Sequence, residues 1–245
     1  MKFFCNNIIF IRRLIIIVLI AVIIILLILG RYNTKKIGVF SEKEAEEFVI
    51  RKGTNVEGKV VSFACKVDWG NDYISPLLDL FDKYNVKITF FPTGRWAAEF
   101  PGIVPKLSAR GHEIGNSGFL NKSYETLSYE NAYEDIDKAD KILRELTGYD
   151  LKLFTTPSGT YNDDVIKAAI DLGYPGIILG SIDTMDWKKG TTTDMINENI
   201  FNKLTTSDII IIHPTKRTVD SLGTIIEELL TQNYKIVPVS EMLKK

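Results

Sequence analysis

The chain is poor in the residues that build disulfide frameworks. It has only two cysteines in 245 residues, Cys5 before a long apolar run and Cys65 well beyond it. A membrane-spanning segment between them would place them on opposite sides, so no disulfide framework follows. Each cysteine is expected to act as a small apolar side chain rather than as a reactive thiol.

Positive charge is scarce outside the N-terminal segment. Residues 1–40 hold six bases and no acid, so the remainder carries 30 − 6 = 24 bases against 31 acids, a net charge of −7. Binding to phosphate backbones needs clustered Lys and Arg, and no basic stripe is present. The sequence therefore predicts that nucleic acid is not a partner.

One long stretch has no charge at all. Residues 14–29 are wholly apolar and follow Arg12 and Arg13. At about 1.5 Å per residue the run spans roughly 24 Å, slightly less than a hydrocarbon core of about 30 Å. A cleaved signal peptide is the alternative, but the small-residue cleavage pattern is poor. We expect a single-pass signal-anchor over residues 14–30, with residues 1–13 in the cytoplasm and the rest on the extracytoplasmic side of the cell membrane.

The remainder divides into a linker and one domain. Residues 31–57 are predicted to be a linker with one short helix, because Ser41 and Glu44 fit a capping box. From residue 58 to 245, short β-branched or aromatic runs alternate with amphipathic patterns. The predicted strands are 60–65, 86–91, 112–115, 151–155, 176–179, 209–212 and 234–239, and the helices lie near 75–84, 102–109, 129–146, 163–172, 193–204 and 221–232.

This alternation indicates a parallel sheet in an α/β domain, either doubly wound or closed into a barrel. In both architectures the functional site lies at the carboxyl ends of the strands. The loops at those ends are rich in polar and aromatic residues. Asp68 and Trp69 follow the first strand, Asp183, Asp186 and Trp187 follow the fifth, and His213 ends the sixth.

These motifs, in this order, resemble the polysaccharide deacetylase family (NodB homology domain, carbohydrate esterase family 4), and most closely its sporulation-associated branch. The resemblance covers about residues 59–243. It rests on Trp69-Gly70-Asn71 after the first strand, on Tyr84-Asn85-Val86-Lys87-Ile88-Thr89-Phe90-Phe91 followed by Gly94-Arg95-Trp96, on Gly111-His112-Glu113-Ile114-Gly115-Asn116, and on Asp183-Thr184-Met185-Asp186-Trp187.

The resemblance implies a distorted (β/α)7 barrel that removes an N-acetyl group from a cell-wall glycan. In active relatives an aspartate and two histidines hold a divalent metal, zinc or a similar ion, which polarises a water and the acyl oxygen. A second aspartate is the general base, and a histidine on a later strand is the general acid. A role in sporulation is an association that comes with the resemblance alone.

The metal site carries over only in part. The family's paired histidines fall on Ser117 and Asn121, which are poor zinc ligands, and His112 and His213 are the only histidines available. If Asp68-Trp69-Gly70 matches the family's Asp-Asp-Gly, the base survives and the metal aspartate becomes Trp69. If Ser62-Phe63 matches Thr-Phe instead, both acids are lost. Residues 155–159 lack the arginine of the family's Arg-Pro-Pro-Tyr-Gly motif.

The candidate residues follow from this comparison. Asp68 is a candidate base or sugar-binding acid, His213 a candidate acid, and Asp186 the group that orients His213. The candidate substrate-binding residues are Trp69, Trp187, Pro157, Asn162 and Asp183. His112, which opens a strand, is expected to be structural.

Three functions remain open. The first is a non-catalytic or metal-independent protein that binds peptidoglycan or a related N-acetylated glycan at the membrane. The second is an active deacetylase with a divergent site. It would use Asp68 and His213 either without a tightly bound metal or with Mg²⁺ or Ca²⁺ held through oxygen ligands by Asp68, Asp72 and Asn121. The third is a scaffold in an envelope or spore-assembly complex. No cofactor is expected unless the site is active, and then only a divalent metal.

Overall fold

The computed structural model describes residues 16–25, 40–54 and 56–243. The chain divides into two compact units, Met1–Val39 and Phe40–Lys245. Residues 16–25 are helical with exposed side chains. The other residues of the predicted anchor lie outside the described part, in which no helix combines the length and the apolar character needed to cross a bilayer.

A buried parallel sheet forms the centre of the second unit. Strand β2 (Val60–Val67) is buried along all eight residues and lies between β3 (Thr89–Pro92) and β7 (Ile209–Ile212). Strand β4 (Glu113–Ile114) pairs with β3, β6 (Ile182–Asp183) pairs with β7, and β8 (Lys235–Ile236) pairs with the start of β2. Every one of these pairings is parallel, as the run-and-helix alternation predicted.

A short second sheet continues this arrangement. Strand β1 (Val49–Ile50) pairs in parallel with β5 (Ile177–Ile178). The predicted strand at 151–155 contributes bridges only at Phe154, which pairs with Asn116 on one side and Ile177 on the other. Parallel pairing therefore passes from Asn116, just beyond β4, through Phe154 to β5.

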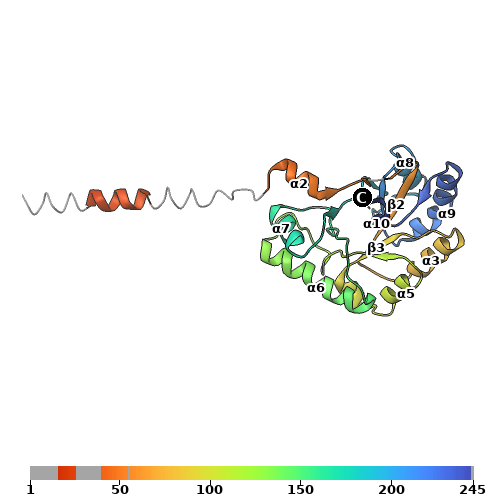
Figure 1. Ribbon diagram of the computed structural model, residues 1–245, viewed down its shortest axis with the longest axis horizontal. Coiled ribbons are helices and arrows are strands. Elements are labelled where there is room, and N and C mark those ends of the chain that lie inside the picture. The colour runs from red at the N-terminus through yellow and green to blue at the C-terminus, as the bar shows by residue number, and fades with distance from the viewer. Residues whose placement is uncertain (1–15, 26–39, 55, 244–245) are drawn as a thin grey trace, which may run out of the picture. The chain divides into compact units, whose positions relative to one another are not determined.

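Helices surround these strands (Figure 1). Several follow predicted segments closely, because each keeps an apolar stripe against the sheet. Their bounds are α3 Ile74–Lys83, α4 Gly94–Glu99, α5 Ile103–Ala109, α6 Tyr129–Thr147, α7 Asp163–Asp171, α8 Thr193–Phe201, α9 Lys216–Thr231 and α10 Val239–Leu243.

The predicted linker is partly a folded element. Helix α2 (Glu42–Phe48) begins at Ser41 with the expected capping box. The side chains of Phe40 and Phe48 pack against the main core, and β1 follows the helix directly. Residues 40–50 therefore belong to the compact unit, which corrects the linker assignment for this part of the chain.

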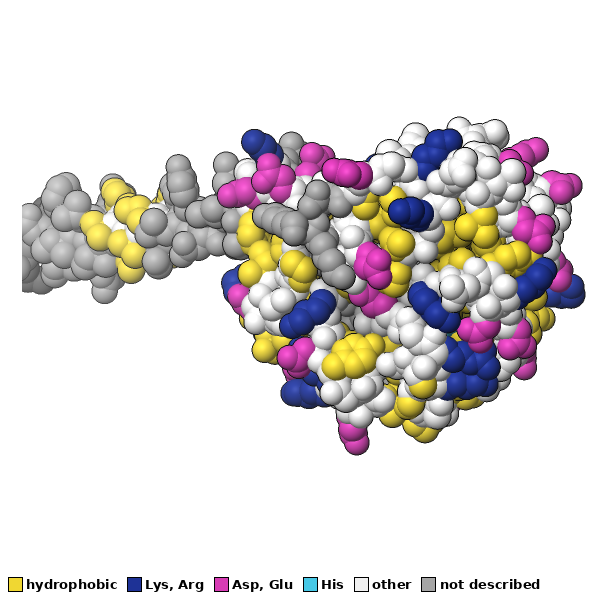
Figure 2. Space-filling view, turned by 45° about the vertical axis from the view of Figure 1, so that its right-hand side comes forward, with side chains coloured by type: hydrophobic (Ala, Val, Ile, Leu, Met, Phe, Trp, Pro, Cys, Tyr) yellow, Lys and Arg dark blue, Asp and Glu magenta, His cyan; other side chains and the backbone are white. Residues whose placement is uncertain are grey.

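Charges are mixed on the surface of the compact unit. On the face shown in Figure 2, Lys and Arg side chains are interspersed with Asp and Glu. Within helices of the compact unit, short ion pairs join residues one turn apart, such as Lys216 with Asp220 and Lys167 with Asp171. On this face no extended basic surface suits a polyanion.

Candidate functional site

The carboxyl ends of the strands converge on one cavity. Strands β2 and β7 are neighbours with Cys65 opposite Ile212, so the residues that follow them emerge side by side. The cavity has a volume of about 360 Å³. Six of the predicted site residues line it: Asp68, Trp69, Pro157, Asp183, Trp187 and His213.

Asp186 holds His213 in place. The carboxylate is fully buried, and its Oδ1 lies 2.7 Å from His213 Nδ1. Its Oδ2 accepts the backbone N–H of His213 at 2.7 Å and the hydroxyl of Thr218 at 2.5 Å. With Nδ1 committed to Asp186, the ring nitrogen Nε2 is the one left for chemistry in the cleft. This is the geometry predicted for an oriented acid.

Two tryptophans form the walls of the cleft. The indole of Trp69 stacks on the His213 ring, with centroids 5.7 Å apart and planes 17° from parallel. Trp69 and Trp187 are 44% and 50% exposed, unlike the fully buried aromatics of the core. The loop that carries Trp69 is fixed by Trp96, whose Nε1 donates to Gly70 O at 2.6 Å. Half-exposed indoles of this kind are suited to stacking on sugar rings.

Asp68 is half-buried at the end of β2. Burial raises the pKa of its carboxyl, and His213, a hydrogen bond from Asn121 and the nearby Arg95 and Lys66 act in the opposite direction. Its Oδ1 is buried and has no hydrogen-bond partner. A buried carboxylate oxygen without a partner is uncommon and points to a site that is completed by a ligand or by water.

Lys66 is a functional candidate that the sequence reasoning missed. It lies in the buried strand β2, is only 9% exposed, and lines the cavity. Its Nζ donates to Thr156 O at 2.9 Å. Burial lowers the pKa of Lys66 to about 8, although Asp183 and Asp68 favour its charged form. The available signal was a lysine directly after the predicted strand 60–65, which the structure extends through Val67, since lysine is rarely buried unless it is paired.

The donor set does not suit a tightly bound zinc. Within the described residues no three His, Cys, Asp or Glu side chains are grouped to hold a metal. At the family's histidine positions Ser117 is buried outside the cavity lining, and Asn121 hydrogen-bonds to Asp68. Asp72, offered above as an oxygen ligand, is exposed and does not line the cavity. The Lys66 ammonium adds a positive charge that opposes a second cation there.

Two further residues have structural roles. Asn162 lies outside the cavity lining, because its Oδ1 caps α7 through Val165 N and its Nδ2 donates to the carbonyls of Glu125 and Leu127. Its predicted role in substrate binding is therefore replaced by a role in fixing the loop. His112 accepts the Ile88 N–H and packs edge-on against Phe90, in line with the structural role expected for it.

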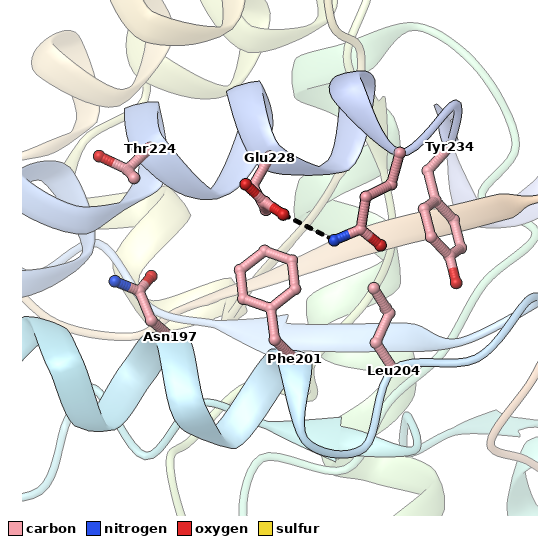
Figure 3. Close-up of a pocket in the computed structure, with 7 residues that line it drawn as sticks. Asn197, Phe201, Leu204, Thr224, Glu228 and Tyr234 are labelled. Atoms are coloured by element: carbon pink, nitrogen blue, oxygen red, sulfur yellow. Dashed lines mark hydrogen bonds between the residues drawn. The ribbon is translucent and has the colours of Figure 1, made fainter.

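A second cavity, of about 340 Å³, lies between α8 and α9 (Figure 3). Phe201 points from α8 toward α9, where Gln232 Nε2 donates to Glu228 Oε1 at 2.7 Å. Leu204 and Gln232, which follow the carboxyl-terminal ends of these helices, line this cavity. Because each helix leads into the start of the next strand, the cavity lies at the amino-terminal side of the strands. It is therefore separate from the cleft that holds His213.

The structure is thus of the parallel α/β class, with an Asp-oriented histidine at the strand ends, where sites of this class lie. Comparison with known families makes this specific, since residues 55–177 match the family model of the polysaccharide deacetylases. The chain belongs to the polysaccharide deacetylase family, which confirms the resemblance inferred from its motifs.

Individual relatives are identical to this chain at about 30% of the aligned positions. It is 30% identical to the peptidoglycan-N-acetylglucosamine deacetylase of Bacillus cereus, over 71% of this chain and 64% of that protein. It is also 30% identical to the Bacillus subtilis protein YlxY, over 79% of this chain and 60% of that protein. The chain thus spans less than two thirds of the length of these relatives.

The solved structures similar to this chain include a pseudoenzyme. The crystal structure of BA3943, a pseudoenzyme of carbohydrate esterase family 4 from Bacillus anthracis, superposes with a TM-score of 0.76 at 31% identity. The match covers 80% of this chain and 69% of that one. A BA3943 mutant with restored enzymatic activity superposes with the same TM-score.

Proposed function

We propose that this protein binds N-acetylated cell-wall glycan, peptidoglycan or a close analogue, in the cleft at the strand ends, with little or no metal-dependent deacetylase activity. Family membership and the name of the Bacillus cereus relative support the glycan class. The similarity to a pseudoenzyme supports the weak or absent catalysis.

One observation carries the proposal. The cleft keeps the parts that orient and surround a sugar, namely the Asp186–His213 pair and two half-exposed tryptophans. Ser117 and Asn121 stand where the resemblance places the family's two metal-binding histidines, and Trp69 stands in place of the metal aspartate if Asp68-Trp69-Gly70 matches the family's Asp-Asp-Gly. A Lewis acid supplies several kcal/mol of transition-state stabilisation, so its loss slows acetyl hydrolysis far more than it weakens glycan binding.

A slow hydrolase is the second candidate. Asp68 is half-buried with a raised pKa, and His213 is oriented by Asp186, so a base and an acid face one cavity. These two groups support proton transfer without a metal. The geometry favours binding over turnover, because the polarising cation of the family has no imidazole ligands here.

The test combines metal content, binding and turnover on the full chain. We expect no stoichiometric zinc in elemental analysis or titration, measurable binding of N-acetylglucosamine oligomers, and no acetate release above background. Rapid acetate release that a chelator abolishes would contradict the proposal. Slow release that a chelator leaves unchanged, and that Asp68→Asn removes, would favour the slow hydrolase.

We also propose that residues 14–30 anchor the protein in the cell membrane, with the compact unit on the outer side in reach of the cell wall. The apolar run and its flanking arginines support this placement. We further propose that the compact unit is a distorted barrel of seven β/α units. The parallel strand order β4-β3-β2-β7-β6 supports this architecture. If no glycan oligomer binds, the protein would instead be interpreted as a scaffold that does not bind glycan.

A further inference from the structure

Lys66 gives the cleft a cation of its own. Its ammonium has three N–H donors, and within the described part of the chain it makes one hydrogen bond, to Thr156 O. Asp68 Oδ1, in the same cavity lining, is buried without a partner, and so is Oγ1 of Thr156, whose carbonyl accepts the lysine's hydrogen bond. Polar groups are left unsatisfied in this way only rarely in native interiors. The cleft therefore has N–H donors on Lys66 and an acceptor on Asp68 that the protein does not use.

The charges around Lys66 define what would bind. The cavity lining contains this one lysine and two carboxylates, Asp68 and Asp183, which interact electrostatically with it. An anionic ligand would meet the lysine but also two negative groups. A neutral group with an acceptor next to a donor matches better, because the ammonium serves the acceptor and a carboxylate serves the donor. An amide has this pattern, with its C=O and N–H side by side.

Apolar surface in the same cavity fits the rest of an acetamido group. Leu179 and Ile211 line the same cavity as the lysine, and the half-exposed Trp69 and Trp187 line it as well. The methyl of an acetamido group would contact Leu179 and Ile211, and the sugar ring would stack on the tryptophans. A bare amine, as in a deacetylated sugar, has no acceptor for the ammonium and adds an unfavourable like charge.

We propose that Lys66 binds the carbonyl oxygen of the ligand's N-acetyl group and so makes this cleft selective for acetylated over deacetylated sugars. This assignment rests on the proposed function and adds to it a specificity-determining residue that replaces metal coordination with a charged hydrogen bond. The alternative to this binding role is that Lys66 only neutralises the charges of Asp68 and Asp183.

The experiment measures binding of an N-acetylglucosamine tetramer and of its fully deacetylated counterpart to the full chain by calorimetry. Lys66→Met keeps the length of the side chain and removes the charge, and Lys235→Met, an exposed lysine on β8, is the matched control. We expect Lys66→Met to bind the acetylated tetramer about tenfold or more weakly, and to bind the deacetylated one at least as well as the unaltered chain does, because the like charge is removed. Lys235→Met should bind both as the unaltered chain does.

The outcomes separate the two proposals. If Lys66→Met keeps the full preference for the acetylated tetramer, the role of Lys66 is overturned while glycan binding stands. If the unaltered chain binds neither tetramer, the proposed function fails and the assignment of Lys66 fails with it. Should Lys66→Met not fold, an N-trifluoroacetyl tetramer tests the unaltered chain, because its carbonyl is a poorer acceptor. Weaker binding of that ligand is expected, and equal binding would overturn the assignment.

Discussion

At the scale of single residues, Lys66 shows a conflict between stability and function. It lies in a strand whose eight residues are all buried, and burial lowers its pKa from 10.5 to about 8. Desolvating an ammonium destabilises the fold, so a lysine at this position is explained by what it does in the cleft rather than by packing. Asp183 and Asp68 offset part of that destabilisation.

This conflict predicts a pH-dependent gain in stability for Lys66→Met. Between pH 8 and 10.5 the unfolded chain keeps a proton that folded Lys66 has lost, so the unfolding free energy of the unaltered chain rises with pH across this window. The rise amounts to about 3 kcal/mol, and the variant lacks it. In urea unfolding, the variant should therefore have the higher free energy of unfolding. Its advantage over the unaltered chain should be largest below pH 8 and decline toward pH 10.5. A difference independent of pH would contradict the buried charge.

Asp186 is the second residue with a large predicted effect. It is fully buried and accepts three hydrogen bonds, two from His213 and one from Thr218. Asp186→Asn turns one acceptor into a donor that faces existing donors. We expect a loss of about 2–4 kcal/mol in the free energy of unfolding, measured with urea.

Asp183→Asn is the matched control for this substitution. Asp183 lies three residues earlier, at the end of β6, but is exposed, and its side chain accepts the Met185 N–H at 2.8 Å. It should change stability by less than about 1 kcal/mol. Equal losses in the two variants would show that Asp186 has no special role in holding His213.

At the scale of elements, long periodic segments were predictable and short ones were not. Helix α6 and strand β7 match their predicted positions because their apolar residues repeat over several turns or form an unbroken run. Strands β1 and β6 have two residues each, too few for any period. The same limit applies within the site. Motif order located Asp68 and His213, whereas the burial of Lys66 and the capping role of Asn162 depend on neighbours distant in sequence.

The docking of α2 and β1 gives a prediction at this scale. Gly176, just before β5, has no room for a side chain, since an added Cβ would lie 2.7 Å from Ile50 Cδ1 and 2.8 Å from Phe48 O. Gly176→Ala should therefore push β1 away and lower the free energy of unfolding by about 1–3 kcal/mol. Gly102→Ala is the control, because nothing lies within 4 Å of its added Cβ and its φ of −80° suits alanine. Thermal unfolding compares the two, and an unchanged melting temperature for Gly176→Ala would mean that residues 40–50 do not pack as described.

At the scale of the whole molecule, charge and hydrophobicity are divided between the two units. The first forty residues hold six bases and the apolar run, and the remainder has a net charge of −7. An acidic domain is repelled by anionic lipid headgroups, so membrane attachment would depend on the apolar run rather than on surface charge. A glycan ligand without net charge is compatible with such a domain, whereas a polyphosphate is not.

The last prediction concerns this attachment and the side on which the domain lies. Expressed in a bacterial host, the full chain should stay with membranes in high salt and in alkaline carbonate, and a chain that begins at Phe40 should be soluble, because an inserted apolar helix is not released by either treatment. Thiol labelling reports orientation, since Cys5 is predicted to be cytoplasmic and the other cysteine, Cys65, is fully buried with a pKa raised by that burial. A membrane-impermeant reagent should label Cys5 only after the cells are opened. Labelling of Cys5 in intact cells would reverse the orientation, and with it the access of the cleft to the cell wall.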